Sequence, residues 1–269
     1  MIPNHRLSEF QNDSMTPNTK RRKYISDLVA RHGYARVTDL AENLGVTTVT
    51  IRTDLKYLED KGVLIRSHGG AITSTSTVRD LKEDIKKKAN AVPKKLIGKE
   101  AARLISENDS IIIASGSTMV AFAEEIVPRE NLNVVTPSIR IASRFIDMPN
   151  VTILQLGGII YGNSLSTRGA YAEAGLETLH CSKVFFGVEG FDIKSGLTCA
   201  TLEEANLTRK MMKSATQSIV LADSTKFCRR GFGKICNLED IDILITDSGL
   251  PAEARNAIEA IGITVILAH

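Results

Sequence analysis

Residues 47–56 carry side chains whose types and spacing suit contact with DNA. Threonine hydroxyls can bond a base edge or a phosphate, an arginine can bond two acceptors of guanine at once, and methyl groups can touch thymine. The candidate DNA contacts in this stretch are Thr47, Thr48, Val49, Thr50, Arg52, Thr53 and Lys56. This mixture of hydroxyl, apolar and cationic groups predicts a surface that reads the major groove.

A second set of small and polar residues falls at five places after residue 113, each at the end of an apolar, strand-like stretch. The clearest is loop 114–118, where N–H groups and hydroxyls can surround a phosphate beside a helix N-terminus. Asp192 and Glu204 can accept sugar hydroxyls, and Lys226 is expected to be the only cation among these positions. The candidate effector-binding residues are Ser115, Gly116, Ser117, Thr118, Thr136, Ser138, Gly157, Gly158, Glu189, Asp192, Thr198, Glu204, Asp223 and Lys226. One such loop alone is equally typical of a good turn, so the interpretation depends on all five together.

Other kinds of chemistry are not indicated. Lys99 follows Gly98 but lacks the upstream glycine and the Ser or Thr of a Walker loop. The cysteines form no C-x-x-C pair and have no histidine at ligand spacing, so we interpret them as reduced thiols; they are Cys181, Cys199, Cys228 and Cys236. We therefore expect no catalytic residue, no metal ion and no cofactor.

Three successive helical patterns must position the first set of residues. The first covers about residues 21–31, and Gly33 is expected to end it in a left-handed conformation. The second begins with Thr38 as its expected N-cap and stops at Gly45. These two short helices precede the one that carries the candidate DNA contacts.

The third helix begins after Thr47, its expected N-cap, and is the candidate recognition helix. Its core stripe is Ile51, Leu55 and Leu58, so a step of about 100° per residue turns the other side of the helix outward. The outward residues are Val49, Thr53 and Lys56, with Thr50 and Arg52 on the two flanks. A solvated amphipathic helix is the alternative interpretation of this helix taken alone.

Residues 62–72 follow the third helix and read as two short strands around a glycine turn, with Gly62 ending the helix. Three helices and such a wing, in this order, are typical of a winged helix-turn-helix. Thr38, Arg66 and His68 are further candidate DNA contacts.

The charge distribution agrees with a DNA-binding N-terminal part. The first 75 residues hold 11 Lys and Arg against 8 Asp and Glu, and the remainder of the chain is formally neutral. The whole surplus of three positive charges thus lies where phosphate contacts would need it.

The chain of 269 residues divides on composition into four parts. We expect a disordered polar arm over residues 1–19, the DNA-binding domain over 20–73, a linker over 74–95 and a second domain over 96–269. Residues 86–88 are three lysines that either contact DNA backbone or belong to a solvated helix face. No apolar run approaches a membrane span and no signal core is present, so a cytoplasmic protein is expected.

The second domain alternates between strand and helix patterns, which predicts an α/β fold with a mostly parallel sheet covered on both faces. Strands are expected at 110–113, 133–135, 151–156, 183–187, 218–222 and 241–246. Helices are expected on faces including Ile97–Ile105 and Val120–Val127, and at 139–146, 170–179, 202–215 and 251–261. Ligands of such sheets bind beyond the carboxyl ends of the strands.

The motif Thr47-Thr48-Val49-Thr50-Ile51-Arg52-Thr53-Asp54-Leu55, with Leu58-Glu59 and Arg66-Ser67-His68-Gly69-Gly70 after it, resembles the DeoR-type bacterial transcriptional regulators. Thr47 stands where those proteins usually have Ser, and Thr53 where Arg or Lys is common. The resemblance extends from about Lys20 to the C-terminus. It implies a winged helix-turn-helix joined to an effector-sensing domain.

The strand-end loops also resemble the effector domain of that family, which is similar to ribose-5-phosphate isomerase and binds phosphorylated sugars. The matching segments are Ala114–Thr118, Thr136–Ser138, Gly187–Asp192, Gly196–Thr198 with Glu204-Ala205, and Asp223–Cys228. Ala114 replaces the usual Asp and Pro137 the usual Asn, which leaves the identity of the sugar open.

Two functions are therefore weighed. An isomerase needs a carboxylate base beside the sugar carbons, but Gly190-Phe191-Asp192 and Gly196-Leu197-Thr198 keep only remnants of the isomerase motifs. The favoured prediction is a repressor of a sugar-utilisation operon that binds operator DNA and is released by a sugar phosphate. Readers of this type use paired half-sites, so a homo-oligomer, a dimer or a tetramer, is expected.

Overall fold

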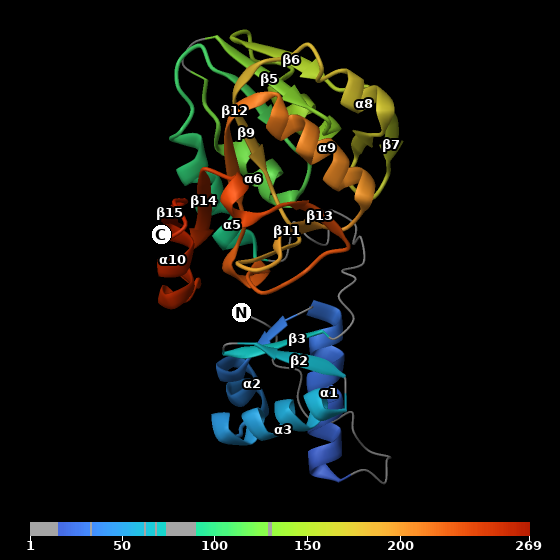
Figure 1. Ribbon diagram of the computed structural model, residues 1–269, viewed down its shortest axis with the longest axis vertical. Coiled ribbons are helices and arrows are strands. Elements are labelled where there is room, and N and C mark those ends of the chain that lie inside the picture. The colour runs from blue at the N-terminus through green and yellow to red at the C-terminus, as the bar shows by residue number, and fades with distance from the viewer. Residues whose placement is uncertain (1–15, 33, 62, 68, 74–89, 129–130) are drawn as a thin grey trace. The chain divides into compact units, whose positions relative to one another are not determined.

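The protein was analysed as a computed structural model, shown in Figure 1. The described residues are 16–32, 34–61, 63–67, 69–73, 90–128 and 131–269. The chain forms two compact units, Met1–Thr75 and Ser76–His269, and each is treated by itself. Most of the predicted arm, and residues 74–89 of the predicted linker, which include Lys86–Lys88, lie outside the described residues.

The first unit consists of three helices and a small antiparallel sheet in the order β1-β3-β2. Its elements are α1 (Pro17–His32), β1 (Tyr34–Arg36), α2 (Val37–Leu44), α3 (Thr48–Asp60), β2 (Leu64–Ser67) and β3 (Gly70–Thr73). One apolar cluster joins them, with Ile25, Leu40, Ile51, Leu55 and Leu64 almost fully buried. The predicted winged helix-turn-helix is the arrangement observed.

Two helix starts differ from the prediction. Helix α1 begins at Pro17 rather than near residue 21, since proline at a first helical position has the right φ and lacks an N–H that would have no partner there. Residues 17–19 therefore belong to a helix and not to the arm. Thr38 is not an N-cap, because strand β1 leads directly into α2 and Arg36 occupies the cap position, where its side chain makes no capping hydrogen bond.

The other expected helix boundaries are confirmed where they are described. Gly45 ends α2 with a φ of 62° and bonds back to the last turn, as a left-handed C-cap does. Thr47 caps α3, accepting a hydrogen bond from the Thr50 N–H. Gly33, Gly62 and His68 lie outside the described residues.

The second unit is built on seven parallel strands in the order β15-β14-β12-β9-β4-β5-β6. The strands are β4 (Ser110–Ile113), β5 (Leu132–Thr136), β6 (Val151–Gln155), β9 (Cys181–Phe186), β12 (Ala215–Leu221), β14 (Ile243–Asp247) and β15 (Thr264–Ala268). Edge strand β15 was not predicted. The central strands are apolar on both faces, as a doubly covered parallel sheet requires.

Helices cover both faces of this sheet (Figure 1). They are α5 (Ala91–Ala102), α6 (Ser117–Glu125), α7 (Ile139–Phe145), α8 (Ala170–Ala174), α9 (Leu202–Lys213) and α10 (Ala252–Glu259). Helix α5 packs closely on α6 and reaches β14 and β15, whereas α9 lies against β9 and β12. The predicted α/β class is confirmed.

Several boundaries in this unit were predicted wrongly. Helix α5 starts at Ala91, so the linker cannot extend to residue 95. Helix α6 ends at Glu125, and Val127, expected on its buried face, is 80% exposed. The chain is extended there because Pro128 follows, and a residue before proline avoids the helical region. Helix α8 ends at Ala174 rather than near residue 179.

Five short strands outside the main sheet were also missed. They are β7 (Ile159–Tyr161), β8 (Ser166–Arg168), β10 (Gly190–Asp192), β11 (Gly196–Cys199) and β13 (Gly233–Cys236). β7 pairs with β8, and β10, β11 and β13 form a second small sheet. Gly190 permits this sheet, since a Cβ there would overlap the backbone carbonyl of Arg229. Among the described helices, none is long and apolar enough to cross a membrane.

Candidate DNA-binding and effector-binding sites

Helix α3 presents the predicted surface. Val49 is 67% exposed, and Arg52, Thr53 and Lys56 are exposed as well. Thr50 is half-buried on the flank. The predicted division of α3 into a core stripe and an outward face is confirmed, although contact with DNA itself stays a prediction.

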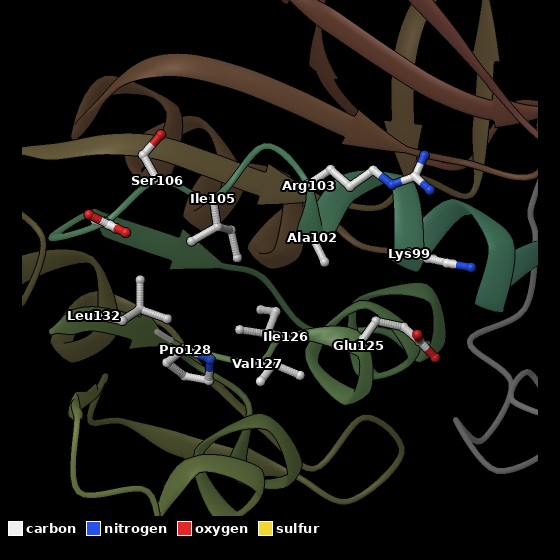
Figure 2. A pocket seen from close by; sticks show the side chains of 11 residues that line it. Lys99, Ala102, Arg103, Ile105, Ser106, Glu125, Ile126, Val127, Pro128 and Leu132 are labelled. Atoms are coloured by element: carbon white, nitrogen blue, oxygen red, sulfur yellow. The ribbon is translucent and has the colours of Figure 1, made fainter. Parts of the chain in front are cut away.

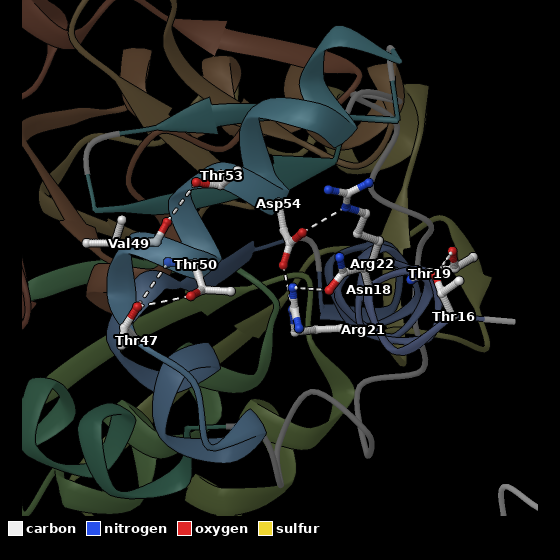
Figure 3. A network of polar contacts seen from close by, with 10 residues as sticks. All are labelled: Thr16, Asn18, Thr19, Arg21, Arg22, Thr47, Val49, Thr50, Thr53 and Asp54. Atoms are coloured by element: carbon white, nitrogen blue, oxygen red, sulfur yellow. Dashed lines mark hydrogen bonds and ion pairs between the residues drawn. The ribbon is translucent and has the colours of Figure 1, made fainter.

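The threonine hydroxyls of α3 are partly used inside the helix (Figure 3). Thr53 Oγ1 donates to the Val49 carbonyl at 3.0 Å, and the hydroxyls of Thr47 and Thr50 lie 3.0 Å apart. These bonds hold the side chains in one orientation. Thr53 retains acceptor capacity and its methyl group for a base edge.

Asp54 is a structural centre of the first unit that sequence reasoning did not single out. Its side chain is 1% exposed and accepts hydrogen bonds from Arg21 Nε at 2.6 Å and Arg22 Nε at 2.7 Å. Figure 3 shows how this carboxylate joins α1 to α3. Arg22 also stacks over the Tyr57 ring at 3.8 Å. The orientation of the recognition helix therefore depends on a charged core contact, for which no helical periodicity gives a signal.

The wing residue Arg66 is held by α3. Its backbone N–H and Nε donate to the two carboxylate oxygens of Glu59, at 2.8 Å and 2.5 Å. The backbone bond from Arg66, with its side-chain bond, lowers the pKa of Glu59. Arg66 is thus oriented by an exposed ion pair rather than free on the wing.

The candidate effector residues follow strands whose carboxyl ends meet at one edge of the parallel sheet. From β4 the chain proceeds outward to β5 and β6, while β9 lies on the other side of β4 and leads to β12. Strand order reverses between β4 and β9, and such a switch point forms a crevice between the two following loops. The structure brings Ser115–Thr118, after β4, and Glu189, after β9, to this switch point.

Some predicted ligands have local structural roles. Asp192 Oδ1 accepts the backbone N–H groups of Lys194 and Ser195, which closes the turn between β10 and β11. Thr198 Oγ1 donates to the Gly190 carbonyl and accepts from Gly231 N–H. These local bonds are sufficient to explain why Asp192 and Thr198 are polar, so neither residue needs a ligand as its partner.

Two hydroxyls after β5 are used locally in the same way. Thr136 Oγ1 accepts from Ser138 N–H, and Ser138 Oγ caps α7. On the loop after β6, Gly157 and Gly158 are exposed, and Gly158 has a φ of 132°. Thr136 and Ser138 are fully buried at this edge of the sheet, whereas the two glycines are exposed.

Lys226 is the only cation among the predicted effector positions, but the fold brings further cations to this edge. Its Nζ donates to Glu189 Oε2 at 2.8 Å, and both side chains are largely buried. Burial lowers the pKa of Arg229, while the carboxylates of Glu189 and Asp223 act against that shift. Arg168 adds a third cation. The sequence spacing could not show this, because Arg168 and Arg229 lie outside the strand-end motifs.

Asp223 has the arrangement expected of a ligand-binding carboxylate. It is 1% exposed, and its Oδ1 accepts from Asn90 Nδ2 at 3.0 Å and from the Thr225 N–H at 3.2 Å. Its other oxygen, Oδ2, is buried without a hydrogen-bond partner, as is Thr246 Oγ1 on neighbouring β14. Buried polar atoms are normally paired, so within the described chain these two mark places where a polar ligand can bond.

Glu204 faces a cation rather than an open crevice. It stands in the first turn of α9, and its Oε2 lies 4.0 Å from Arg168 Nη2. Arg168 is 3% exposed and was missed by sequence reasoning, since a single arginine in a loop gives no signal. Cys199 lies among these groups: burial, then the Glu204 carboxylate, raises the pKa of its thiol, with Arg168 and Glu189 also in range.

A separate groove of about 660 Å³ lies at the opposite edge of the sheet (Figure 2). Its apolar floor includes Ile105, Ile126 and Leu132, and Lys99, Arg103 and Glu125 stand on its rim. Leu132 begins β5, so this groove is at the amino ends of the strands. None of the predicted effector residues lines it.

Comparison with known protein families gives two matches that together span most of the chain. Residues 21–82 match the DeoR-like helix-turn-helix domain, and residues 89–248 match the DeoR C terminal sensor domain. Both agree with the resemblance read from the motifs.

Individual relatives carry regulatory names. A putative aga operon transcriptional repressor of Escherichia coli O157:H7 is 32% identical over 94% of this chain and 95% of its own. The L-fucose operon activator of Haemophilus influenzae is 29% identical over 92% of this chain and 99% of its own. These names favour a regulator over the enzyme alternative.

Among solved structures, ribose 5-phosphate isomerase A of Methanocaldococcus jannaschii matches with 15% identity and a TM-score of 0.36. The match covers 52% of this chain and 55% of that chain. At this level the likeness carries no argument about function.

Proposed function

Because the chain belongs to the DeoR family of transcriptional regulators, we propose that it represses a sugar-utilisation operon and leaves its operator when a phosphorylated sugar binds the second unit. The observation that carries the proposal is the buried, half-partnered carboxylate of Asp223 at the carboxyl edge of the sheet. An acceptor held in place by Asn90 and Thr225, with one oxygen unused, is suited to a sugar hydroxyl.

The phosphate is proposed to lie at the switch point beside Ser115–Thr118. Ser115 and Gly116 lead into α6, which begins at Ser117 and whose first N–H groups lack partners in the helix and carry positive potential. Lys226 is proposed to bind the same anion after leaving Glu189. Because the Lys226–Glu189 pair is partly buried, it should break only when the ligand is the stronger partner.

DNA binding is proposed through α3 in the major groove. Arg52 reads a base, while Thr47 and Thr48 at the start of the helix contact phosphate. Two copies of the reader are proposed to bind paired half-sites, which makes the protein a dimer or a tetramer in the cytoplasm.

Thermodynamic linkage gives the test. A ligand that releases the repressor must bind the free protein more tightly than the DNA-bound protein, and operator DNA must weaken ligand binding by the same factor. The full chain is titrated with operator DNA and with members of a sugar-phosphate series, each in the absence and presence of the other. We expect about 5–150-fold mutual weakening for the correct sugar phosphate and none for the unphosphorylated sugar. Equal ligand affinity in the free and DNA-bound protein contradicts the proposal.

A further inference from the structure

Arg168 is a buried cation at the end of β8. The β7–β8 hairpin follows β6, and β8 is tied to the loop after β5, since Thr167 N–H donates to the Pro137 carbonyl at 2.9 Å. Arg168 is therefore held at the same edge of the sheet as the proposed effector crevice. Only 3% of the residue is exposed.

The hydrogen bonds made by this guanidinium are all to neutral groups. Nη1 donates to Thr201 Oγ1 at 3.1 Å and Nη2 to Ser164 Oγ at 3.2 Å. Nε is buried with no partner in the described chain. The Glu204 carboxylate stands 4.0 Å away, beyond hydrogen-bond distance. A buried charge is normally both paired and hydrogen-bonded, and the ion pair between Arg168 and Glu204 includes no hydrogen bond.

The partners of Arg168 lie at the N-terminus of α9. Thr201 is the N-cap, and its hydroxyl accepts the Glu204 N–H. The N–H groups of Leu202 and Glu203 have no acceptor within the helix, because they lie in its first turn. A helix N-terminus attracts anions and repels cations. A guanidinium beside it is thus unfavourable unless an anion lies between the two.

We propose that Arg168 and the N-terminus of α9 form an oxyanion subsite, which binds a second acidic group of the effector, a phosphate or a carboxylate. The guanidinium supplies Nε–H and an Nη–H as a planar pair of donors, which matches two oxygens of such a group. Thr201 Oγ1 and the free N–H groups of α9 complete the subsite. This subsite is separate from the contacts proposed for Lys226, and it rests on the proposed function only for the identity of its ligand.

Tyr161 controls access to the subsite. Its ring lies 4.9 Å from the Arg168 guanidinium carbon and is partly exposed on β7, a strand whose residues are all exposed. Movement of this ring opens the guanidinium to the ligand. Because the ring packs on the cation by a cation–π contact, the arginine remains covered until an anion replaces that contact.

Inorganic phosphate is the probe for a direct test on the full chain. Phosphate is titrated at constant ionic strength, and the rise in melting temperature of the second unit gives its affinity. Arg168→Gln, which keeps a polar side chain but removes the charge, is expected to weaken phosphate binding at least tenfold, because a charge-assisted bidentate contact is lost. Arg168→Lys is expected to recover part of the affinity, and Arg255→Gln, an exposed arginine paired with Glu259, to leave it unchanged. A parallel titration with acetate distinguishes a phosphate subsite from a carboxylate subsite.

Glu204→Gln provides a variant with the opposite expectation. It removes the nearest carboxylate from Arg168, so phosphate is expected to bind about threefold to tenfold more tightly. The Glu204→Gln titration tests the subsite even if Arg168→Gln does not fold, because no gain in phosphate affinity is expected if Arg168 has only a structural role. Unchanged phosphate affinity in Arg168→Gln, or no gain in Glu204→Gln, overturns the subsite.

Failure of the proposed function looks different. If phosphate binds through Arg168 but no sugar phosphate alters operator affinity, the subsite stands and the inducer model falls. If a sugar phosphate releases DNA equally from the wild type and Arg168→Gln, the inducer model stands and the subsite falls.

Discussion

Replacing Asp54 with Asn tests whether the charged contact between α1 and α3 supports the recognition helix. The carboxylate is 1% exposed and accepts two charge-assisted bonds, from Arg21 and Arg22. Asparagine keeps the shape but has one acceptor oxygen and no charge, so at least one arginine loses its partner. The change isolates the electrostatic contact from the packing of α3.

The size of the effect follows from the burial of each partner. Breaking a fully buried ion pair costs about 3–5 kcal/mol. Here the arginine side chains are 17% and 25% exposed and regain some hydration, which reduces the expected cost to about 2–3 kcal/mol. Glu59→Gln is the matched control, because Glu59 and Arg66 are 31% and 46% exposed and such a pair contributes about 0–1 kcal/mol.

Native-state hydrogen exchange on the full chain measures this cost locally. Peptides from α1 and α3 should exchange about 30-fold faster or more in Asp54→Asn, while peptides from the second unit remain unchanged. Glu59→Gln should change exchange in α3 less than about fivefold. If the two variants accelerate exchange in α3 equally, Asp54 does not stabilise the reader in the way argued here.

Three further predictions concern the two sites and the buried thiols. Arg52→Ala should weaken operator binding by about 1–3 kcal/mol and relax specificity at one position; wild-type affinity and specificity in a titration at fixed salt would remove Arg52 from the interface. Lys226→Ala should leave DNA binding nearly intact and abolish the response to sugar phosphate in a gel-shift assay, whereas Lys210→Ala, which removes an exposed pair with Glu177, should respond normally. Burial raises the pKa of Cys236 to about 12, against about 8.5 when unfolded, so the unfolded chain loses this proton first and stability falls as pH rises above about 8.5. Urea unfolding at pH 8 and pH 10 should show that Cys236→Ala loses about 1–2 kcal/mol less than the wild type; equal losses would mean that this thiol ionises freely in the folded protein.

The sequence allowed the reader and the main sheet to be predicted because both follow regular periods. Ile51, Leu55 and Leu58 mark one face of α3, and the apolar strands at 110–113 and 218–222 read as buried runs. Short strands such as β7 and β11 were missed, since three or four residues give no period and their pairing depends on distant partners. Element boundaries were wrong where a backbone constraint acted, as at Pro17 and Pro128.

The sequence predicted which residues gather at the carboxyl edge of the sheet, but not the charged groups that surround them. The small residues at 115–118 and the polar residues after β12 could be predicted to lie at the carboxyl edge, because each group directly follows its strand in the sequence. Nothing in the sequence indicated the role of Arg168, since its partners Ser164 and Thr201 lie in a hairpin and at a helix cap that only the fold brings together. Motifs therefore predicted residues that the fold gathers at one edge of the sheet, whereas the charged groups around them required the structure.

Lys226 and Arg168 differ in how closely a carboxylate approaches them. Lys226 already has a close carboxylate, at 2.8 Å, while the nearest carboxylate to Arg168 stands 4.0 Å away. An incoming anion must compete with Glu189 at Lys226, but at Arg168 it fills a gap in a buried charge distribution. Since a buried charge without a hydrogen-bonded anion is costly, the gain on binding should be larger at Arg168. In Arg168→Gln the loss of effector affinity should therefore exceed the loss in Lys226→Gln, and the reverse order would place the principal anion contact at Lys226.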